Sequence, residues 1–261
     1  MKRRSSWKLP CLFTVFLVVV AGAGAGEPAA VQGAAARKLY FPPAEGSWEK
    51  VQAAESGWDL VKLKAALELA GRRKSSAVVI LYQGRLLAEQ YWEVPAKPKD
   101  EKGRLKRYFY LRHGKGVGGR IIEDIASAQK SIVSLLVGIA GQKGLLKLSD
   151  PVDKHLGAGW SKAPREKEKK ITLRHLITMS SGLKIDLGYE APAGTKWKYN
   201  TPAYSHSLQA VAAASGMSPD ELTKKWLSGP LGMVDSRWID RRLKRIEATT
   251  GVKQKKANTL G

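Results

Sequence analysis

The stretch that decides the fold is Glu123-Asp-Ile-Ala-Ser-Ala-Gln-Lys-Ser-Ile-Val-Ser-Leu-Leu-Val-Gly-Ile-Ala140. Its apolar residues recur at the spacing of one helix face, at Ile132, Leu135, Leu136 and Ile139. Ser127 stands where this pattern begins, at a position typical of a helix N-cap. The pattern therefore predicts a buried helix that Ser127 opens.

The same stretch carries a candidate nucleophile and a candidate base. Lys130 follows Ser127 by three residues, so on a helix the amine and the hydroxyl face the same way. If burial keeps the amine neutral, it can take the hydroxyl proton, and N–H groups at the helix start can hold an oxyanion. The alternative is a plain capping serine followed by a solvated lysine, and this stretch by itself leaves both interpretations open.

The spacing Ser-x-x-Lys is weak evidence, because a basic chain produces it by chance. It occurs four times here, starting at Ser5, Ser47, Ser127 and Ser181. The copy at Ser127 is the one that opens a long apolar helix pattern, and we therefore take it as the candidate.

Length and composition indicate a folded protein, and nothing in them points to a metal site or a disulfide. The chain has 261 residues, 43% of them hydrophobic, which suits one large domain or two small ones. A single cysteine, Cys11, excludes a disulfide framework, and the four histidines show no paired metal-ligand spacing. We expect no cofactor and no metal.

Residues 1–26 are typical of a secretory signal peptide. A basic tip precedes an apolar run from Leu12 to Val20, and small residues follow at positions 21–26. The run is short for a stable transmembrane span, although an uncleaved anchor is the alternative. We expect the mature chain to start near Glu27 and to be periplasmic or secreted.

The chain carries a formal net charge of +22. Residues 94–120 contain nine Lys and Arg against two acidic residues, with three aromatic residues among them. Such a mixture can bind nucleic acid, but with an export signal we favour a solvated basic insertion and expect no nucleic acid. The anionic cell envelope is a plausible partner for this charge.

The rest of the chain predicts one hairpin and several helices. Strand-like runs at 76–82 and 85–92 flank Gln83-Gly84, a two-residue hairpin turn. Asp59 precedes a helix over 60–70, and Thr172 caps one over 171–180. We also expect helices over 201–214 and 219–227, a linker over 27–57 and a charged surface loop over 161–170.

Four stretches, taken together, are more specific than any single motif: Ser127–Ala140, Leu148–Leu156, Ile171–Leu183 and Pro192–Tyr204. From about Asp59 to Asp240 the chain resembles the serine hydrolases built on the class C β-lactamase fold, which include D-alanyl-D-alanine carboxypeptidases and esterases. The resemblance implies an α/β (α+β) fold, with an antiparallel sheet beside a mainly helical region, as one domain over 58–261. It also implies that Ser127 is the nucleophile.

The resemblance extends to the family's second motif, Tyr-x-Asn. It implies that Tyr199 relays protons, and that Asn200 and Thr201 bind substrate. The sequence departs from the motif, because Thr201 stands in the third position and asparagine comes one place early. This departure favours an esterase-like or amidase-like member over one that recognises β-lactams.

The family's third motif, a Lys- or His-x-Gly on a strand, is absent after Tyr199. Only Thr249-Thr250-Gly251 has any likeness to this motif, and the motif's cation is missing there. We therefore expect a C-terminally truncated member with an incomplete sheet and impaired activity, because losing one oxyanion donor costs about a hundredfold or more in rate.

These inferences lead to one expected function and one alternative. We expect an exported serine hydrolase that cleaves an ester or amide of a small molecule or peptide, through an acyl-enzyme on Ser127. The alternative is a non-catalytic or weakly active member of the same fold that binds the envelope.

Overall fold

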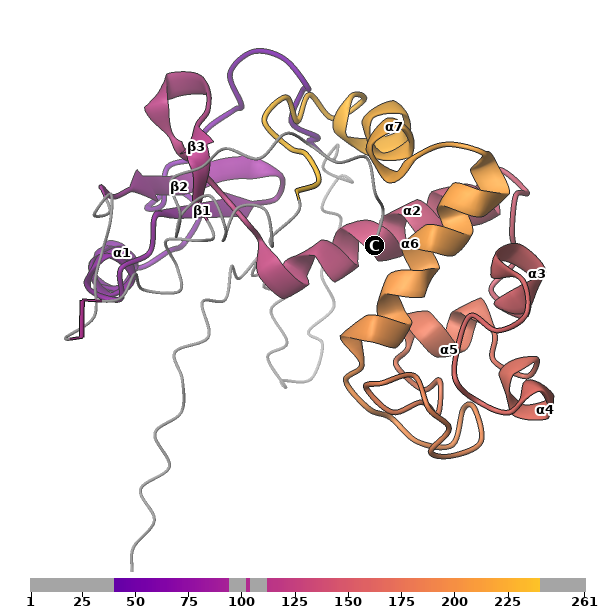
Figure 1. Ribbon diagram of the computed structural model, residues 1–261. Coiled ribbons are helices and arrows are strands. Elements are labelled where there is room, and N and C mark those ends of the chain that lie inside the picture. The colour runs from indigo at the N-terminus through magenta and orange to yellow at the C-terminus, as the bar shows by residue number, and fades with distance from the viewer. Residues whose placement is uncertain (1–39, 94–101, 104–111, 240–261) are drawn as a thin grey trace, which may run out of the picture. The chain divides into compact units, whose positions relative to one another are not determined.

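The structure is a computed structural model that describes residues 40–93, 102–103 and 112–239 (Figure 1). The chain divides into two compact units, the first within residues 1–109 and 114–121 and the second within 110–113 and 122–261. The predicted signal peptide, part of the basic segment and the tail from residue 240 lie outside the described residues. In the part that the structure describes, no helix is long and apolar enough to cross a membrane.

The first unit contains the predicted hairpin. Strands β1 (Ala77–Tyr82) and β2 (Arg85–Tyr91) pair antiparallel, and Tyr82 lies opposite Arg85 at the turn. Gln83 and Gly84 both have positive φ, of 51° and 83°, as a tight two-residue hairpin turn requires. A side chain on Gly84 would strike the carbonyl oxygen of Tyr40, so glycine is needed there for space as well.

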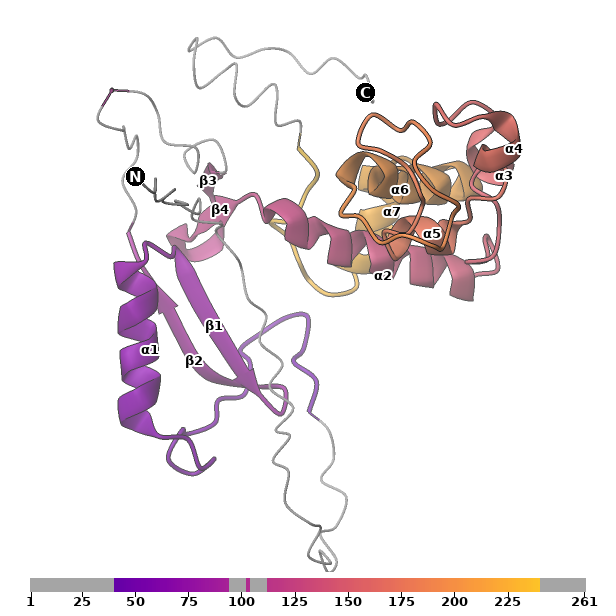
Figure 2. The same cartoon turned by 90° about the horizontal axis from the view of Figure 1, so that it is seen from below.

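Helix α1 (Leu60–Arg72) lies alongside this hairpin, as Figure 2 shows. The side chain of Asp59 accepts the backbone N–H of Lys62 at 3.0 Å, which confirms the predicted cap. The backbone of residues 49–51 exchanges hydrogen bonds with Leu86, of 2.8 and 3.0 Å. Part of the segment predicted as a linker is therefore attached to the hairpin.

A second two-stranded sheet joins β3 (Arg112–Lys115) to β4 (Ile121–Glu123). In the described part of the chain each sheet has two strands, so the expected α+β fold with a partial antiparallel sheet is confirmed.

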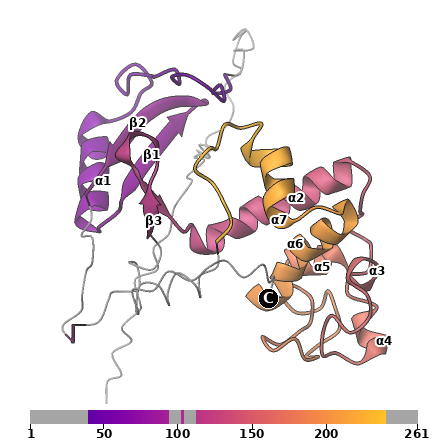
Figure 3. The same ribbon diagram turned by 45° about the horizontal axis from the view of Figure 1, so that its top comes forward.

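The second unit is helical. Its elements are α2 (Gln129–Gln142), α3 (Asp153–Leu156), α4 (Arg165–Glu168), α5 (Leu173–Ile177), α6 (Thr201–Ser215), α7 (Pro219–Thr223) and a π-helical turn, η4 (Lys224–Ser228). Helix α6 contacts α2, α3, α5 and α7, and Figure 3 shows it crossing α2. The core of this unit therefore forms around the α2–α6 pair.

The buried face of α2 differs from the predicted one. Its buried residues are Val133, Leu136, Val137 and Ala140, whereas Leu135 is 52% exposed. The helix is apolar around much of its circumference, so periodicity alone did not identify the face that packs. The small Ala140, fully buried, suits close packing against neighbouring helices.

Helix α5 is shorter than predicted, although its cap is confirmed. The hydroxyl of Thr172 accepts the N–H of His175, and His175 Nδ1 accepts the N–H of Thr172 at 3.1 Å. The helix ends early because Met179 adopts a φ of 56°, in the left-handed region, which a right-handed helix cannot continue through.

Residues 161–170 are not an exposed loop throughout, as the charge pattern predicted. They include α4, whose Glu168 is 1% exposed. Its carboxylate accepts the N–H of Gly159 at 2.8 Å, and both the N–H and the hydroxyl of Ser161 at 2.9 and 2.8 Å. These bonds connect α4 to the preceding loop, so a buried acid organises the segment.

Candidate active site

Ser127 lies in a 3₁₀ turn, η3 (Ala126–Ala128), immediately before α2. The prediction that it caps the helix is wrong, because its side chain makes no capping hydrogen bond. Instead its Oγ accepts a hydrogen bond from Tyr199. The preceding residue, Ala126, has a φ of 48°, and its N–H donates to Asp124 Oδ1 at 2.6 Å. Left-handed backbone at a residue other than glycine is strained, and such strain clusters at functional sites.

Tyr199 reaches Ser127 from a distant part of the sequence. It ends an extended segment just before α6, and its hydroxyl donates to Ser127 Oγ at 2.7 Å. The Tyr199 side chain is 47% exposed, so a substrate can approach the pair from solvent.

Lys130 completes the cluster from the first turn of α2. Its Nζ lies 5.0 Å from the centre of the Tyr199 ring and 5.9 Å from that of Tyr204. Hydrogen bonds with Ser127 and Lys130, the positive charge of Lys130 and the hydroxyl of Thr201 lower the pKa of Tyr199. The structure therefore brings the three predicted catalytic residues together, with a phenol that ionises more readily than usual.

The two predicted substrate-binding residues are placed differently. Asn200 is 1% exposed and caps α6: its Oδ1 accepts the N–H of Ala203, and its Nδ2 donates to the carbonyls of Leu183 and Lys184. Thr201 is exposed and close enough to Tyr199 to influence its pKa. Of the two side chains, only that of Thr201 faces the cluster.

Glu190 supports the segment that carries Tyr199, and no sequence pattern indicated it. Its carboxylate accepts hydrogen bonds from Lys198 at 2.8 Å and Lys196 at 2.9 Å. These two bonds lower the pKa of Glu190 to about 2. The backbone N–H of Lys198 also donates to the carbonyl of Met179 at 2.9 Å. The residue before Tyr199 is thus held at its side chain and its backbone.

Tyr204, on α6, holds the helix turn that carries Lys130. It is 5% exposed, and its hydroxyl donates to the backbone carbonyl of Lys130 at 2.7 Å. Tyr204 lies five residues after Tyr199, on the helix that follows the site. Its contact joins residues 74 apart in the sequence, so no local pattern indicated its role.

Among the described residues no group of three His, Cys, Asp or Glu side chains is placed to hold a metal ion.

The model of the Beta-lactamase family matches residues 52–261. An uncharacterized protein of Alkalihalophilus pseudofirmus is 27% identical over 155 residues, which are 56% of this chain and 39% of the relative.

Two solved structures are also similar. FmtA from Staphylococcus aureus is 19% identical, with a TM-score of 0.48, over 76% of this chain and 53% of that one. The beta-lactamase/D-alanine carboxypeptidase from Yersinia pestis is 25% identical, with a TM-score of 0.38, over 42% and 38%. The chain thus spans about two fifths to one half of the length of these relatives.

Proposed function

This chain belongs to the beta-lactamase family, and on that premise we propose that it is a serine hydrolase that cleaves an ester or amide through an acyl-enzyme on Ser127. The observation that carries the proposal is the 2.7 Å hydrogen bond between Tyr199 and Ser127 Oγ, with Lys130 beside the same phenol. A nucleophile within hydrogen-bond reach of a group that can take its proton is the arrangement that covalent catalysis needs.

The first half-reaction uses Tyr199 in its ionised form. Ser127 Oγ bonds to the substrate carbonyl carbon while its proton passes to the Tyr199 oxygen, and the Lys130 charge stabilises the phenolate. When the tetrahedral intermediate collapses, the bond to the leaving alcohol or amine breaks, and Tyr199 returns the proton to that group. An acyl ester on Ser127 remains.

The second half-reaction repeats these transfers with water. Tyr199 takes a proton from the water that attacks the acyl carbon, and then gives it back to Ser127 Oγ as the carboxylic acid leaves. The N–H groups of Ala126 and Ala128 are bonded to Asp124 and Ile125. We assign the N–H of Ser127 as one oxyanion donor.

Replacing Ser127 with alanine should abolish covalent labelling by a fluorophosphonate probe and lower p-nitrophenyl acetate turnover by about a thousandfold or more. Peptide mass spectrometry locates the label, and a stopped assay measures the turnover. Ser131→Ala, on the next turn of α2, is the matched control and should label normally. Label on another serine, or label that persists in Ser127→Ala, would reject the assignment.

Replacing Tyr204 with phenylalanine should lower kcat about threefold to tenfold with KM nearly unchanged, because the turn that carries Lys130 loses one support. The lost hydrogen bond to the Lys130 carbonyl should also reduce stability by about 1 kcal/mol. Steady-state kinetics and thermal unfolding measure the two effects. Ser205→Ala, exposed on the same helix, is the control; an unchanged kcat in Tyr204→Phe would show that Tyr204 does not position Lys130.

A second candidate function is favoured by the placement of Asn200. Because its amide is buried and bonded to the carbonyls of Leu183 and Lys184, it cannot contact a substrate as the family's asparagine does. This supports a weakly active or non-catalytic member, and the net charge of +22 would suit its binding to the anionic cell envelope. Equal turnover of p-nitrophenyl acetate and nitrocefin by the unaltered chain and by Ser127→Ala would favour this function over hydrolysis.

A further inference from the structure

A pocket of about 250 Å³ opens on the second unit between α4, the start of α5 and the loop that leads towards Tyr199. It is lined by Lys167, Lys170, Ile171, Ser181, Tyr189, Ala191, Pro192 and Ala193. None of the residues of the Ser127 cluster lines it. The pocket is therefore a separate feature that the proposed hydrolysis does not use.

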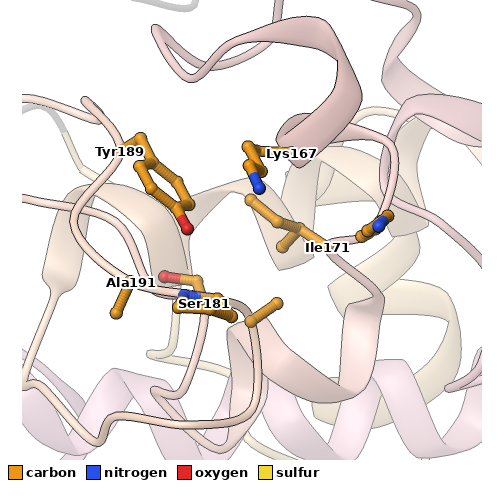
Figure 4. Close-up of a pocket in the computed structure, with 8 residues that line it drawn as sticks. Lys167, Ile171, Ser181, Tyr189 and Ala191 are labelled. Carbon is orange, nitrogen blue, oxygen red and sulfur yellow. The ribbon is translucent and has the colours of Figure 1, made fainter.

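The polar groups of the pocket are hydrogen-bond donors. Figure 4 shows the amine of Lys167 and the ring of Tyr189 facing each other, with Ser181 beneath them. The Lys167 Nζ lies 5.6 Å from the centre of that ring. With Lys170 they supply two ammonium groups and two hydroxyls, and no carboxylate belongs to the lining.

Within the described residues, neither Lys167 nor Lys170 forms a salt bridge. Glu168, next to Lys167, has its carboxylate bonded to Gly159, Ser161 and Arg165. Glu166 forms a salt bridge with Lys169. The charge of Lys170 is a minor cause of the lowered pKa of Glu166. The ammonium groups of Lys167 and Lys170 therefore attract an anion more strongly than paired lysines would.

The remaining lining of the pocket is apolar. It consists of Ile171, which is 2% exposed, together with two alanines and a proline. The volume equals that of roughly eight water molecules and is below the range of sites for drug-sized ligands. A ligand that fits has one small apolar body and one charged group.

We propose that this pocket binds a small molecule that carries an oxyanion, a carboxylate or a phosphate, on an apolar body about the size of one ring. Lys167 and Lys170 hold the anion as two point charges, and the hydroxyls of Tyr189 and Ser181 donate to it. The apolar body lies against Ile171 and the wall formed by residues 191–193. This site goes beyond the proposed hydrolysis and does not depend on it.

Titration of the full-length chain with benzoate, phenyl phosphate and benzamide tests the proposal by calorimetry or NMR. The three probes share a ring, and only the first two carry an anion. At least one anion should bind saturably in the millimolar range, and benzamide should bind at least about tenfold more weakly. Raised salt should weaken the binding of the anion. The preferred anion distinguishes a carboxylate ligand from a phosphate ligand.

Lys167→Met and Lys170→Met should each weaken binding of the anion about threefold to tenfold, and the double variant should show no saturable binding. Lys169→Met is the matched control: Lys169 lies between them in sequence, pairs with Glu166 and does not line the pocket. These lysines are exposed, so the variants should fold, and thermal unfolding checks this. Equal binding of benzamide, no saturable binding of either anion, or full binding by the double variant would overturn the proposal.

Discussion

Replacing Tyr199 with phenylalanine should lower kcat for ester hydrolysis by about a hundredfold to ten-thousandfold, the usual contribution of a general acid–base group. The change removes the oxygen that contacts Ser127 Oγ at 2.7 Å and leaves the ring beside Lys130. Ser127 should still accept a fluorophosphonate label, although more slowly. Steady-state and labelling kinetics measure these effects.

Tyr82→Phe is the matched control, since Tyr82 belongs to the first unit and packs edge-on against Trp58. Its kcat should equal that of the unaltered chain. A Tyr199→Phe variant with the same kcat as this control would remove Tyr199 from the mechanism.

The pH profile separates the roles of Tyr199 and Lys130. A reaction that needs the phenolate speeds up as pH rises towards the pKa of Tyr199, which hydrogen bonds and the Lys130 charge lower from its usual value near 10. In Lys130→Met this rising limb should move to higher pH, because the cation that favours the phenolate is lost. If Lys130→Met has no activity at any pH, Lys130 rather than Tyr199 is the base.

Replacing Glu168 with alanine should destabilise the second unit by about 3 kcal/mol, the largest stability effect that we expect. Three donors, the N–H of Gly159 and the N–H and hydroxyl of Ser161, would lose a buried acceptor. An unsatisfied buried donor costs about 1–3 kcal/mol, although water can enter and reduce the sum. Denaturant unfolding measures the total, and hydrogen exchange at the Gly159 and Ser161 amides locates it.

The effect should also depend on pH. Burial acts to raise the pKa of Glu168, but the hydrogen bonds from Gly159 and Ser161 outweigh it, so the pKa is lower in the folded chain. Its stabilisation is therefore present above the unfolded pKa near 4.5 and is lost as pH falls through the folded value. Glu166→Ala, an exposed acid on the same helix, is the control. Equal losses in both variants would contradict the role of Glu168.

Local rules were enough for several elements of this protein. Asp59 and Thr172 cap their helices, because a short polar side chain can reach an N–H two or three residues ahead. Gln83-Gly84 closes its hairpin, because the turn depends on backbone angles at two adjacent positions. The spacing of Ser127 and Lys130 likewise put both residues at the start of one helix, where each lies next to Tyr199.

Contacts between distant segments decided the rest. The hydrogen bond from Tyr199 joins residues 72 apart, and this bond, rather than a helix N–H, engages the Ser127 hydroxyl. The burial of Asn200 and Glu168 depends on the carbonyls and N–H groups that other loops bring to them. Such partners leave no periodic mark in the sequence, because they are set by how α2, α6 and the loops pack together and not by neighbours along the chain.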